Sequence, residues 1–190
     1  MKADENSIQK IKNLLVTGKP GCGKTTLLVN LLRERSKTRG FYTEEKRRGN
    51  ARVGFAIKTI EGKYGTLAEV GLRSKVQIGR YGVNTKDIDN IMVPEIMAAI
   101  ADDDVSLILI DEIGGMEISS ENFRKAVLAA LDSEKRVLAT IQMKKNPFLD
   151  AIRSRKDVRI VELTPTTRED LRVKILSWLE FEEISNNTKP

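Results

Sequence analysis

Histidine is absent from the 190 residues of this chain, and cysteine occurs once, as Cys22. The lack of histidine excludes histidine-based acid–base catalysis, histidine metal sites and a Ser-His-Asp triad. A single thiol excludes a disulfide within the chain and suits a reducing compartment. We therefore expect a cytoplasmic protein in which Cys22 is a small filler residue and not a nucleophile.

Long apolar stretches are missing as well. No run approaches the roughly 20 residues that a transmembrane helix requires, so we expect no membrane partner. Residues 1–10 are polar and mixed in charge, without the apolar segment of a signal peptide. No repeat, low-complexity tract or linker divides the chain. Its length predicts one domain over residues 1–190, with flexible ends at about 1–10 and 186–190.

What the chain does contain is a glycine-rich motif, Gly18-Lys19-Pro20-Gly21-Cys22-Gly23-Lys24-Thr25, which fits the phosphate-binding loop pattern G-x-x-x-x-G-K-[ST]. Glycine permits a tight concave turn whose N–H groups approach phosphate oxygens. Lys24 supplies a positive charge for β- and γ-phosphates, and the Thr25 hydroxyl can bind Mg²⁺. An apolar run at 11–17 and apolar residues at helical spacing in 26–33 give the strand–loop–helix context that the motif requires. The sequence therefore predicts a nucleotide phosphate site.

Strand and helix patterns alternate along the rest of the chain, which predicts an α/β domain with a mostly parallel sheet flanked by helices. An insertion of antiparallel hairpins is expected at about 40–70. Pro94 must interrupt or restart the helix that contains it. Strands are expected at 52–58, 64–70, 76–83, 105–110, 136–142 and 157–163, and helices at 84–101, 121–131, 147–153 and after a cap at Thr166 or Thr167.

The apolar run 105–110 is typical of a strand buried on both faces of a parallel sheet, and it ends in Asp111-Glu112. An acid at the carboxyl end of such a strand lies at the same edge as the phosphate loop. Asp111 is the expected Mg²⁺ partner, together with Thr25. Glu112 is expected to orient and deprotonate a water in line with the γ-phosphate, so Lys24 and Glu112 are the predicted catalytic residues.

Arginines at the ends of predicted elements could reach charge that develops on a transferred phosphoryl group. For any one of them, a surface or ion-paired role is the favoured interpretation. The candidates for such an arginine finger are Arg80, Arg136, Arg153, Arg155 and Arg168.

The chain resembles the small nucleoside-triphosphatase family first described from thermophiles, whose human member is called cancer-related nucleoside-triphosphatase. The resemblance covers about residues 12–180. It rests on the phosphate loop and on matching segments at Gly40–Glu45, Arg52–Phe55, Gly79–Val83, Ile110–Glu117, Ile152–Val158 and Thr167-Arg168.

This resemblance implies a RecA-like P-loop core and Mg²⁺-dependent hydrolysis of ATP, GTP, CTP and UTP with little base selectivity. Family members usually show Lys at the position of Gly115 and often His at that of Gln142, which predicts an altered rate or nucleotide preference. The implied nucleotide-contacting residues are Gly18, Lys19, Pro20, Gly21, Cys22, Gly23, Lys24, Thr25 and Thr26, followed by Ile110, Asp111, Glu112, Ile113, Gly114, Gly115, Met116 and Glu117.

Two other functions remain open at this point. A small-molecule or nucleotide kinase would explain Arg153 and Arg155 as parts of a lid, although Glu112 favours water as the acceptor and no lid insertion is recognisable. A nucleotide-switched nucleic-acid-binding ATPase would explain the net charge of +6 and the basic turn 46–48. The charges are otherwise dispersed, which favours a solvated surface. The sequence does not fix the oligomeric state, and we expect a monomer.

Overall fold

The computed structural model describes residues 11–32 and 37–186. Of the ends expected to be flexible, at about 1–10 and 186–190, residues 1–10 and 187–190 lie outside the described residues, as does Arg33 of the first predicted helix. In chain order the elements are β1 (Asn13–Thr17), α2 (Lys24–Leu32), β2 (Thr38–Arg48), β3 (Ala51–Thr59), β4 (Tyr64–Val70), β5 (Gln77–Ile78), β6 (Tyr81–Val83), α3 (Thr85–Asp87), the π-helix η1 (Ile88–Met92), α4 (Val93–Ala101), β7 (Leu107–Ile113), the 3₁₀-helix η2 (Glu117–Ser119), α5 (Glu121–Asp132), β8 (Arg136–Ile141), α6 (Pro147–Arg153), β9 (Val158–Glu162) and α7 (Arg168–Asn186).

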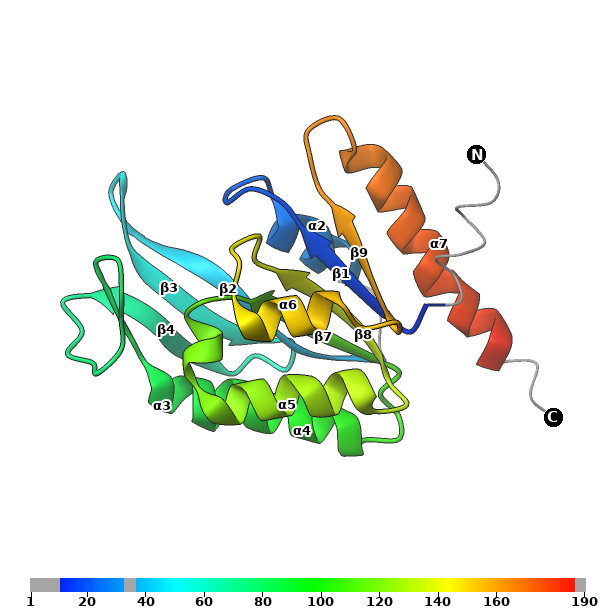
Figure 1. The fold of residues 1–190 in the computed structure, drawn as a ribbon, viewed down its shortest axis with the longest axis horizontal. Coiled ribbons are helices and arrows are strands. Elements are labelled where there is room, and N and C mark those ends of the chain that lie inside the picture. Colours follow the sequence, from blue (N-terminus) through cyan, green and yellow to red (C-terminus); the bar gives the residue numbers. More distant parts are fainter. Residues whose placement is uncertain (1–10, 33–36, 187–190) are drawn as a thin grey trace.

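Within the described residues, nine strands form one sheet in the order β5-β6-β4-β3-β2-β7-β8-β1-β9 (Figure 1). The five strands from β2 to β9 in that order pair in parallel, and β8 lies between β1 and β7. Parallel strands place all their carboxyl ends at one edge, so the segments after β1, β7, β8 and β9 meet there. The predicted α/β fold is confirmed.

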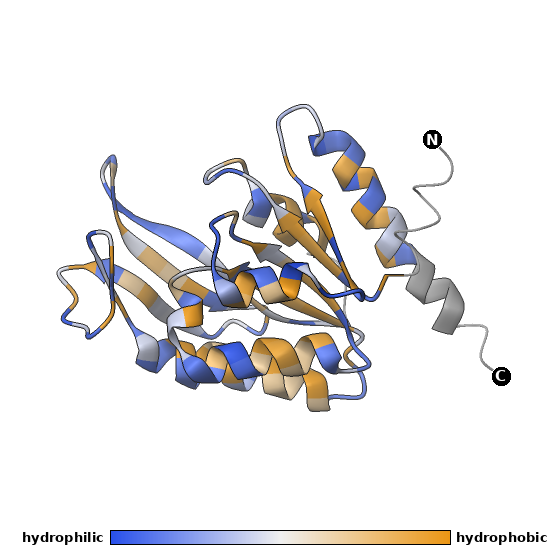
Figure 2. Cartoon of the chain, viewed as in Figure 1, coloured by the Kyte–Doolittle hydropathy of each residue, from blue (hydrophilic) through white to orange (hydrophobic). Residues whose placement is uncertain are grey.

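Helices cover both faces of this parallel core (Figure 1). Leu15, Ile108 and Ile110 face a cluster built with α4, α5 and α6, whereas Leu14 and Leu109 face one built with α2 and α7. Successive side chains of a strand point to opposite faces, so strands buried on both faces read as continuous apolar runs. Figure 2 shows this apolar character along β1. In the described part of the chain, no helix is both long and apolar enough to cross a bilayer.

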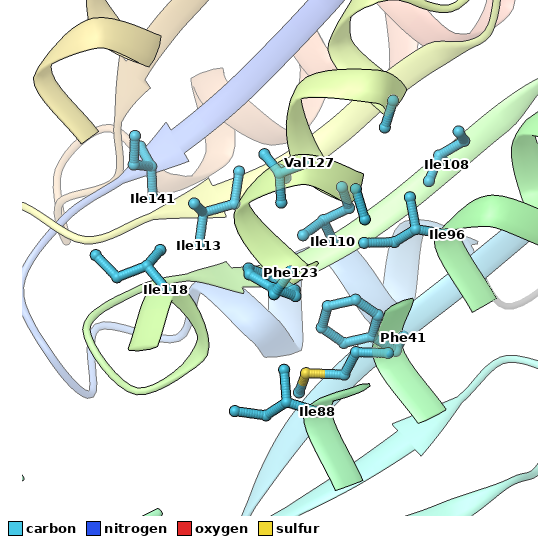
Figure 3. Packing of buried hydrophobic residues seen from close by; sticks show 14 of the residues in the cluster. Phe41, Ile88, Ile96, Ile108, Ile110, Ile113, Ile118, Phe123, Val127 and Ile141 are labelled. Atoms are coloured by element: carbon cyan, nitrogen blue, oxygen red, sulfur yellow. The ribbon is translucent and has the colours of Figure 1, made fainter. Parts of the chain in front are cut away.

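The packing of α5 fixes the segment that follows β7. Phe123 of α5 meets Phe41 of β2 edge to face, with ring centroids 6.0 Å apart, and both rings are fully buried (Figure 3). Ser120 precedes α5, and its Oγ accepts a hydrogen bond from the Phe123 N–H at 3.1 Å. A helix anchored by a cap and a buried aromatic pair holds the chain between Asp111 and Ser120 against the sheet.

The antiparallel part of the sheet is larger than the sequence predicts. β2 pairs in parallel with β7 over residues 38–41 and antiparallel with β3 from Phe41 onward, so one strand belongs to both parts. The antiparallel part then continues through β4 to β6 and ends at Val83. The single strand expected at 76–83 is wrong, because Gly79 has φ +59° and turns the chain into the β5–β6 hairpin.

The helix expected at 84–101 divides into three pieces. Asn84 caps α3 by accepting from the Asp87 N–H, the π-turn η1 follows, and α4 begins at Val93 with Pro94 in its first turn. Proline is tolerated there because the first-turn N–H has no partner within the helix. Pro94 therefore restarts the helix, one of the two outcomes expected from the sequence.

Candidate active site

The phosphate-binding motif forms the turn between β1 and α2 at the carboxyl edge of the sheet. Gly21 and Gly23 have φ of +75° and +88°, backbone conformations that residues with a Cβ rarely adopt. The Cys22 N–H donates to the Lys19 carbonyl at 3.2 Å, which closes the turn. Lys19 and Pro20 are exposed, and the first turn of α2 follows directly at Lys24. Backbone N–H groups at a helix N-terminus behind a glycine turn attract anions.

Lys24 links the loop to the acidic strand end. Its Nζ donates to the Gly18 carbonyl at 3.1 Å and lies 3.7 Å from Glu112 Oε1. Only 11% of the lysine side chain is exposed, so its charge acts in a partly desolvated setting. The ammonium group therefore stands between the phosphate loop and the predicted base, where the terminal phosphates of a bound triphosphate would lie.

Asp111 is held by two threonine hydroxyl groups. Thr25 Oγ1 donates to Asp111 Oδ2 at 2.7 Å, and Thr140 Oγ1 of β8 donates to Oδ1 at 2.6 Å. Burial raises the pKa of Asp111, and the two hydroxyl donors partly oppose that rise. Sequence reasoning missed Thr140, although a hydroxyl residue inside the fully buried strand Arg136–Ile141 was the available signal.

Two glutamates converge beside Asp111. A Cβ placed on Gly114 would lie 2.9 Å from Glu112 Oε2 and 3.0 Å from Glu117 Oε2, so both carboxyl groups approach the same backbone position. Burial raises the pKa of Glu112, Lys24 opposes the rise, and the Asp111 charge adds to it. A carboxylate with a raised pKa holds a proton more tightly, which improves it as a general base.

Replacing Gly114 with alanine is expected to displace the two glutamates. The added methyl group would lie closer to Glu112 Oε2 than carbon and oxygen approach, and it would make a tight contact with Glu117 Oε2. A misplaced base costs up to about 10²-fold in rate. Gly115→Ala is the matched control, because its Cβ would lie no nearer than 3.4 Å to any neighbour. Steady-state phosphate release should give a much lower kcat for Gly114→Ala than for Gly115→Ala, and equal values would contradict this geometry.

Glu117 is buried at the start of η2, with 4% of its surface exposed. Burial, followed by the charges of Glu112 and Asp111, raises its pKa from 4.5 to about 8. Because the pKa of Glu117 is higher in the folded than in the unfolded protein, the folded protein holds one proton more than the unfolded chain between pH 4.5 and about 8. The resulting stabilisation is complete below pH 4.5 and is lost as the pH rises through about 8.

Glu117→Gln is therefore expected to stabilise the protein at alkaline pH, by on the order of a few kcal/mol near pH 9 and little near pH 4. Thermal unfolding across this range in the presence of a chelator measures the effect. Glu121→Gln, a change at an exposed carboxylate paired with Lys125, serves as the control. A difference between Glu117→Gln and the parent chain that does not grow with pH would contradict the raised pKa.

The remaining residues of the segment Ile110–Glu117 lie at different depths below the surface. Ile110 and Ile113 are fully buried in the core, so only their backbone can face a ligand. The Gly115 N–H donates to Gln142 Oε1 at 3.1 Å, so the two positions at which the sequence was expected to differ from other family members are in contact. Met116 is half-buried against the core.

The oxygens of Thr25 and Asp111 suit a magnesium ion. They form the hydroxyl–carboxylate pair described above, and the described residues contain no group of three or more histidine, cysteine or acidic side chains able to hold a metal. Magnesium usually takes one or two protein ligands and completes its octahedral shell with phosphates and water. The donor set therefore fits a metal that binds together with a nucleotide.

Of the five candidate arginines, Arg168 touches the phosphate loop. It begins α7, and its guanidinium donates to the Cys22 carbonyl and packs against Gly23. Arg153 holds the turn after β8 by donating to the carbonyls of Gln142 and Lys144. Arg80 lies in the β5–β6 turn and donates to the Arg52 carbonyl at 2.6 Å.

The other two candidates lie at the opposite edge of the sheet. Arg136 is the first residue of β8, and its guanidinium stacks 3.5 Å from the ring centre of the fully buried Trp178. Arg155 precedes β9 and pairs with Asp132 and Asp157. Parallel strands begin at the edge away from the phosphate loop, so neither arginine reaches the loop of its own chain.

Comparison with known proteins establishes the family. The sequence model of the family described as NTPase matches residues 13–176. The chain belongs to this family. The nucleoside-triphosphatase THEP1 of Thermotoga maritima is 46% identical over 168 residues, which cover 88% of this chain and 95% of that protein. The nucleoside-triphosphatase THEP1 of Thermofilum pendens is 39% identical over 165 residues, or 83% and 90% of the two chains.

Solved structures of NTPase family members share the fold. The crystal structure of THEP1 from the hyperthermophile Aquifex aeolicus aligns with a TM-score of 0.79 at 36% identity, over 88% of this chain and 99% of that one. The solution structure of a human cancer-related nucleoside triphosphatase aligns with a TM-score of 0.74 at 33% identity, over 88% and 97%. The family resemblance stated from the sequence is confirmed.

Proposed function

We propose that this protein hydrolyses nucleoside 5′-triphosphates to the diphosphate and phosphate with Mg²⁺, with water as the acceptor and broad base tolerance. One observation carries the proposal: Lys24 of the phosphate loop and Glu112 of β7 lie 3.7 Å apart at one edge of the sheet. Relatives named nucleoside-triphosphatase match over most of the chain and support the same activity.

The phosphate loop binds and orients the triphosphate. Its backbone N–H groups and the N-terminus of α2 receive the phosphate oxygens, and Lys24 places a charge on the terminal phosphates. Thr25 and Asp111 would hold Mg²⁺, which neutralises charge on the β- and γ-phosphate oxygens when bound. Thr140 orients the Asp111 carboxylate from the strand between β1 and β7.

Glu112 accepts the proton of the attacking water. Its Oε1 lies 3.7 Å from the Lys24 ammonium group, which would contact the terminal phosphates, and burial favours uptake of a proton by its carboxyl group. The nearby ammonium group opposes the rise in the pKa of Glu112 and so favours the ionised carboxylate. Positioning and charge supply most of the rate in phosphoryl transfer, and a general base adds about 10²–10⁴-fold.

Neither alternative function gains support from the described contacts. A kinase lid built from Arg153 and Arg155 is not favoured, because Arg153 binds loop carbonyls and Arg155 lies at the far edge. The basic turn proposed for nucleic acid is largely neutralised. Lys46 pairs with Glu69 at 2.6 Å, and Arg47 pairs with Glu45 at 2.8 Å.

Phosphate release from ATP, GTP, CTP and UTP, with Mg²⁺ and without an acceptor, tests the proposal. Release from all four nucleotides at comparable rates is expected, and omission of Mg²⁺ should abolish it. Negligible release despite tight binding of the Mg²⁺ complexes would overturn hydrolysis as the function. Stimulation only after adding nucleosides or RNA would instead indicate a kinase or a nucleic-acid-dependent ATPase.

A further inference from the structure

A groove of about 320 Å³ lies beside the phosphate loop, between α2 and the start of α7. Thr26, Leu27, Asn30 and Leu31 line it from α2, and Arg168, Glu169 and Arg172 line it from α7. Leu27 and Leu31 give the groove an apolar wall. Arg172 pairs with Glu169 at 3.3 Å, so the net positive charge of the groove comes from Arg168. Nothing in the mechanism above uses these side chains.

The turn between β9 and α7 holds Arg168 in place. The Leu163 N–H donates to the Thr17 carbonyl at 2.8 Å, which ties this turn to the strand end that leads into the phosphate loop. Thr167 Oγ1 accepts from the Thr164 N–H at 2.9 Å and donates to the Glu162 carbonyl at 3.0 Å. Arg168 then reaches back to the Cys22 carbonyl while it also lines the groove. Figure 1 shows this turn, in orange, near the blue loop before α2.

Sheet order fixes the direction in which a bound nucleotide runs. The acids end β7, the phosphate loop follows β1, and Arg168 follows β9, in the spatial order β7-β8-β1-β9. Three strand spacings, about 14 Å, separate the acid side from the Arg168 side. With Glu112 as the proposed base, the γ-phosphate of a bound nucleotide lies on the acid side of the site. The nucleoside of the same nucleotide must then point toward β9 and α7.

We propose that this groove is the nucleoside subsite, in which the base stacks on the Arg168 guanidinium beside Leu31 while the triphosphate occupies the loop. This inference rests on the proposed function and names how the same site takes its substrate. Guanidinium planes and apolar side chains accept the π-face of any base. Stacking without hydrogen bonds to base edges binds purines and pyrimidines alike, which accounts for broad base tolerance.

Calorimetric titration with three probes tests the subsite. The probes are the Mg²⁺ complexes of the non-hydrolysable β,γ-imido analogues of ATP and GTP, and of inorganic tripolyphosphate, which lacks the nucleoside. Arg168→Ala and Arg168→Lys should weaken both nucleotide analogues by about five- to tenfold and tripolyphosphate by less than about twofold. Lysine keeps the charge but not the plane, so it should not rescue binding.

A second pair of variants tests the groove independently of Arg168. Asn30 is exposed on α2, so Asn30→Trp fills the groove without entering the core, and Asn30→Ala is its control. Asn30→Trp should weaken both analogues and spare tripolyphosphate, and Asn30→Ala should bind like the parent chain. Normal nucleotide binding by Asn30→Trp would overturn the proposal.

Two further outcomes separate this inference from the proposed function. If Arg168→Ala weakens the binding of tripolyphosphate and of the nucleotide analogues equally, the subsite is overturned and the arginine is assigned to the phosphates. That outcome leaves the proposal of hydrolysis unaffected. If the variants show the expected binding pattern but the parent chain releases no phosphate, the subsite is supported and hydrolysis is rejected. Full binding by Arg168→Lys would overturn stacking, because charge alone would then suffice.

Discussion

Glu112→Gln is expected to lower kcat for Mg²⁺-ATP by about 10²–10⁴-fold while the affinity for the nucleotide stays nearly unchanged. Glutamine keeps the size of the side chain but cannot take the proton of the attacking water. The phosphate contacts come from the loop and Lys24, which the change leaves in place. The loss therefore falls on the chemical step and not on binding.

Single-turnover phosphate release together with calorimetric binding of the β,γ-imido analogue of ATP separates these two quantities. Glu162→Gln is the matched control, because Glu162 is an exposed glutamate at the carboxyl end of β9 at the same sheet edge. Glu162→Gln should retain the parent rate. A Glu112→Gln protein that turns over at the parent rate would reject Glu112 as the base, and a large loss of binding would assign it to substrate positioning.

Asp111→Asn is expected to abolish most activity and to raise thermal stability at the same time. The amide has about the shape of the carboxylate, and the hydroxyl groups of Thr25 and Thr140 can accept as well as donate, so both contacts can persist. The negative charge that attracts Mg²⁺ is lost, and the Mg²⁺ concentration required should rise by at least about tenfold. Because burial raises the pKa of Asp111, its ionised form costs stability above that pKa, and the amide removes this cost.

Phosphate release as a function of Mg²⁺ concentration measures the first effect, and thermal unfolding at pH 8 with a chelator measures the second. Thr140→Val provides a comparison, because it removes one donor to Asp111 and leaves the carboxylate charge. That variant should keep a Mg²⁺ requirement much closer to the parent. An Asp111→Asn protein with lower thermal stability than the parent would show that the ionised carboxylate stabilises the fold.

Local motifs made much of the candidate site predictable. The strand–glycine turn–helix pattern places Lys24 and Thr25, and the acids after an apolar strand fall at the same edge because parallel strands share their direction. Arg136 and Arg155 could have been set aside by the same rule, since each stands at the beginning of a strand. Arg168 could not be singled out, because its contact with Cys22 depends on how the turn after β9 folds back.

Long-range pairing accounts for what the sequence left open. The antiparallel pairing of β2 with the adjacent β3 agrees with the hairpin expected at about 40–70, but nothing in β2 signals that its first residues pair with β7, which is distant in the chain. Gly79 lies within an apolar stretch, and only the φ of +59° turns that stretch into a hairpin. The raised pKa of Glu117 also depends on neighbours that the helix η2 brings together.

The two outer strands of the sheet have a bearing on how the protein behaves at high concentration. Unpaired edges recruit strands from other molecules, and proteins limit this with short edge strands and with charge. One border here, β5, has two residues, Gln77 and Ile78. The other, β9, has five residues, of which Arg159 and Glu162 are charged and exposed. Neither border offers a long, uncharged template, so the nine-stranded sheet resists growth into aggregates even though its central strands β1, β7 and β8 are mostly buried and apolar.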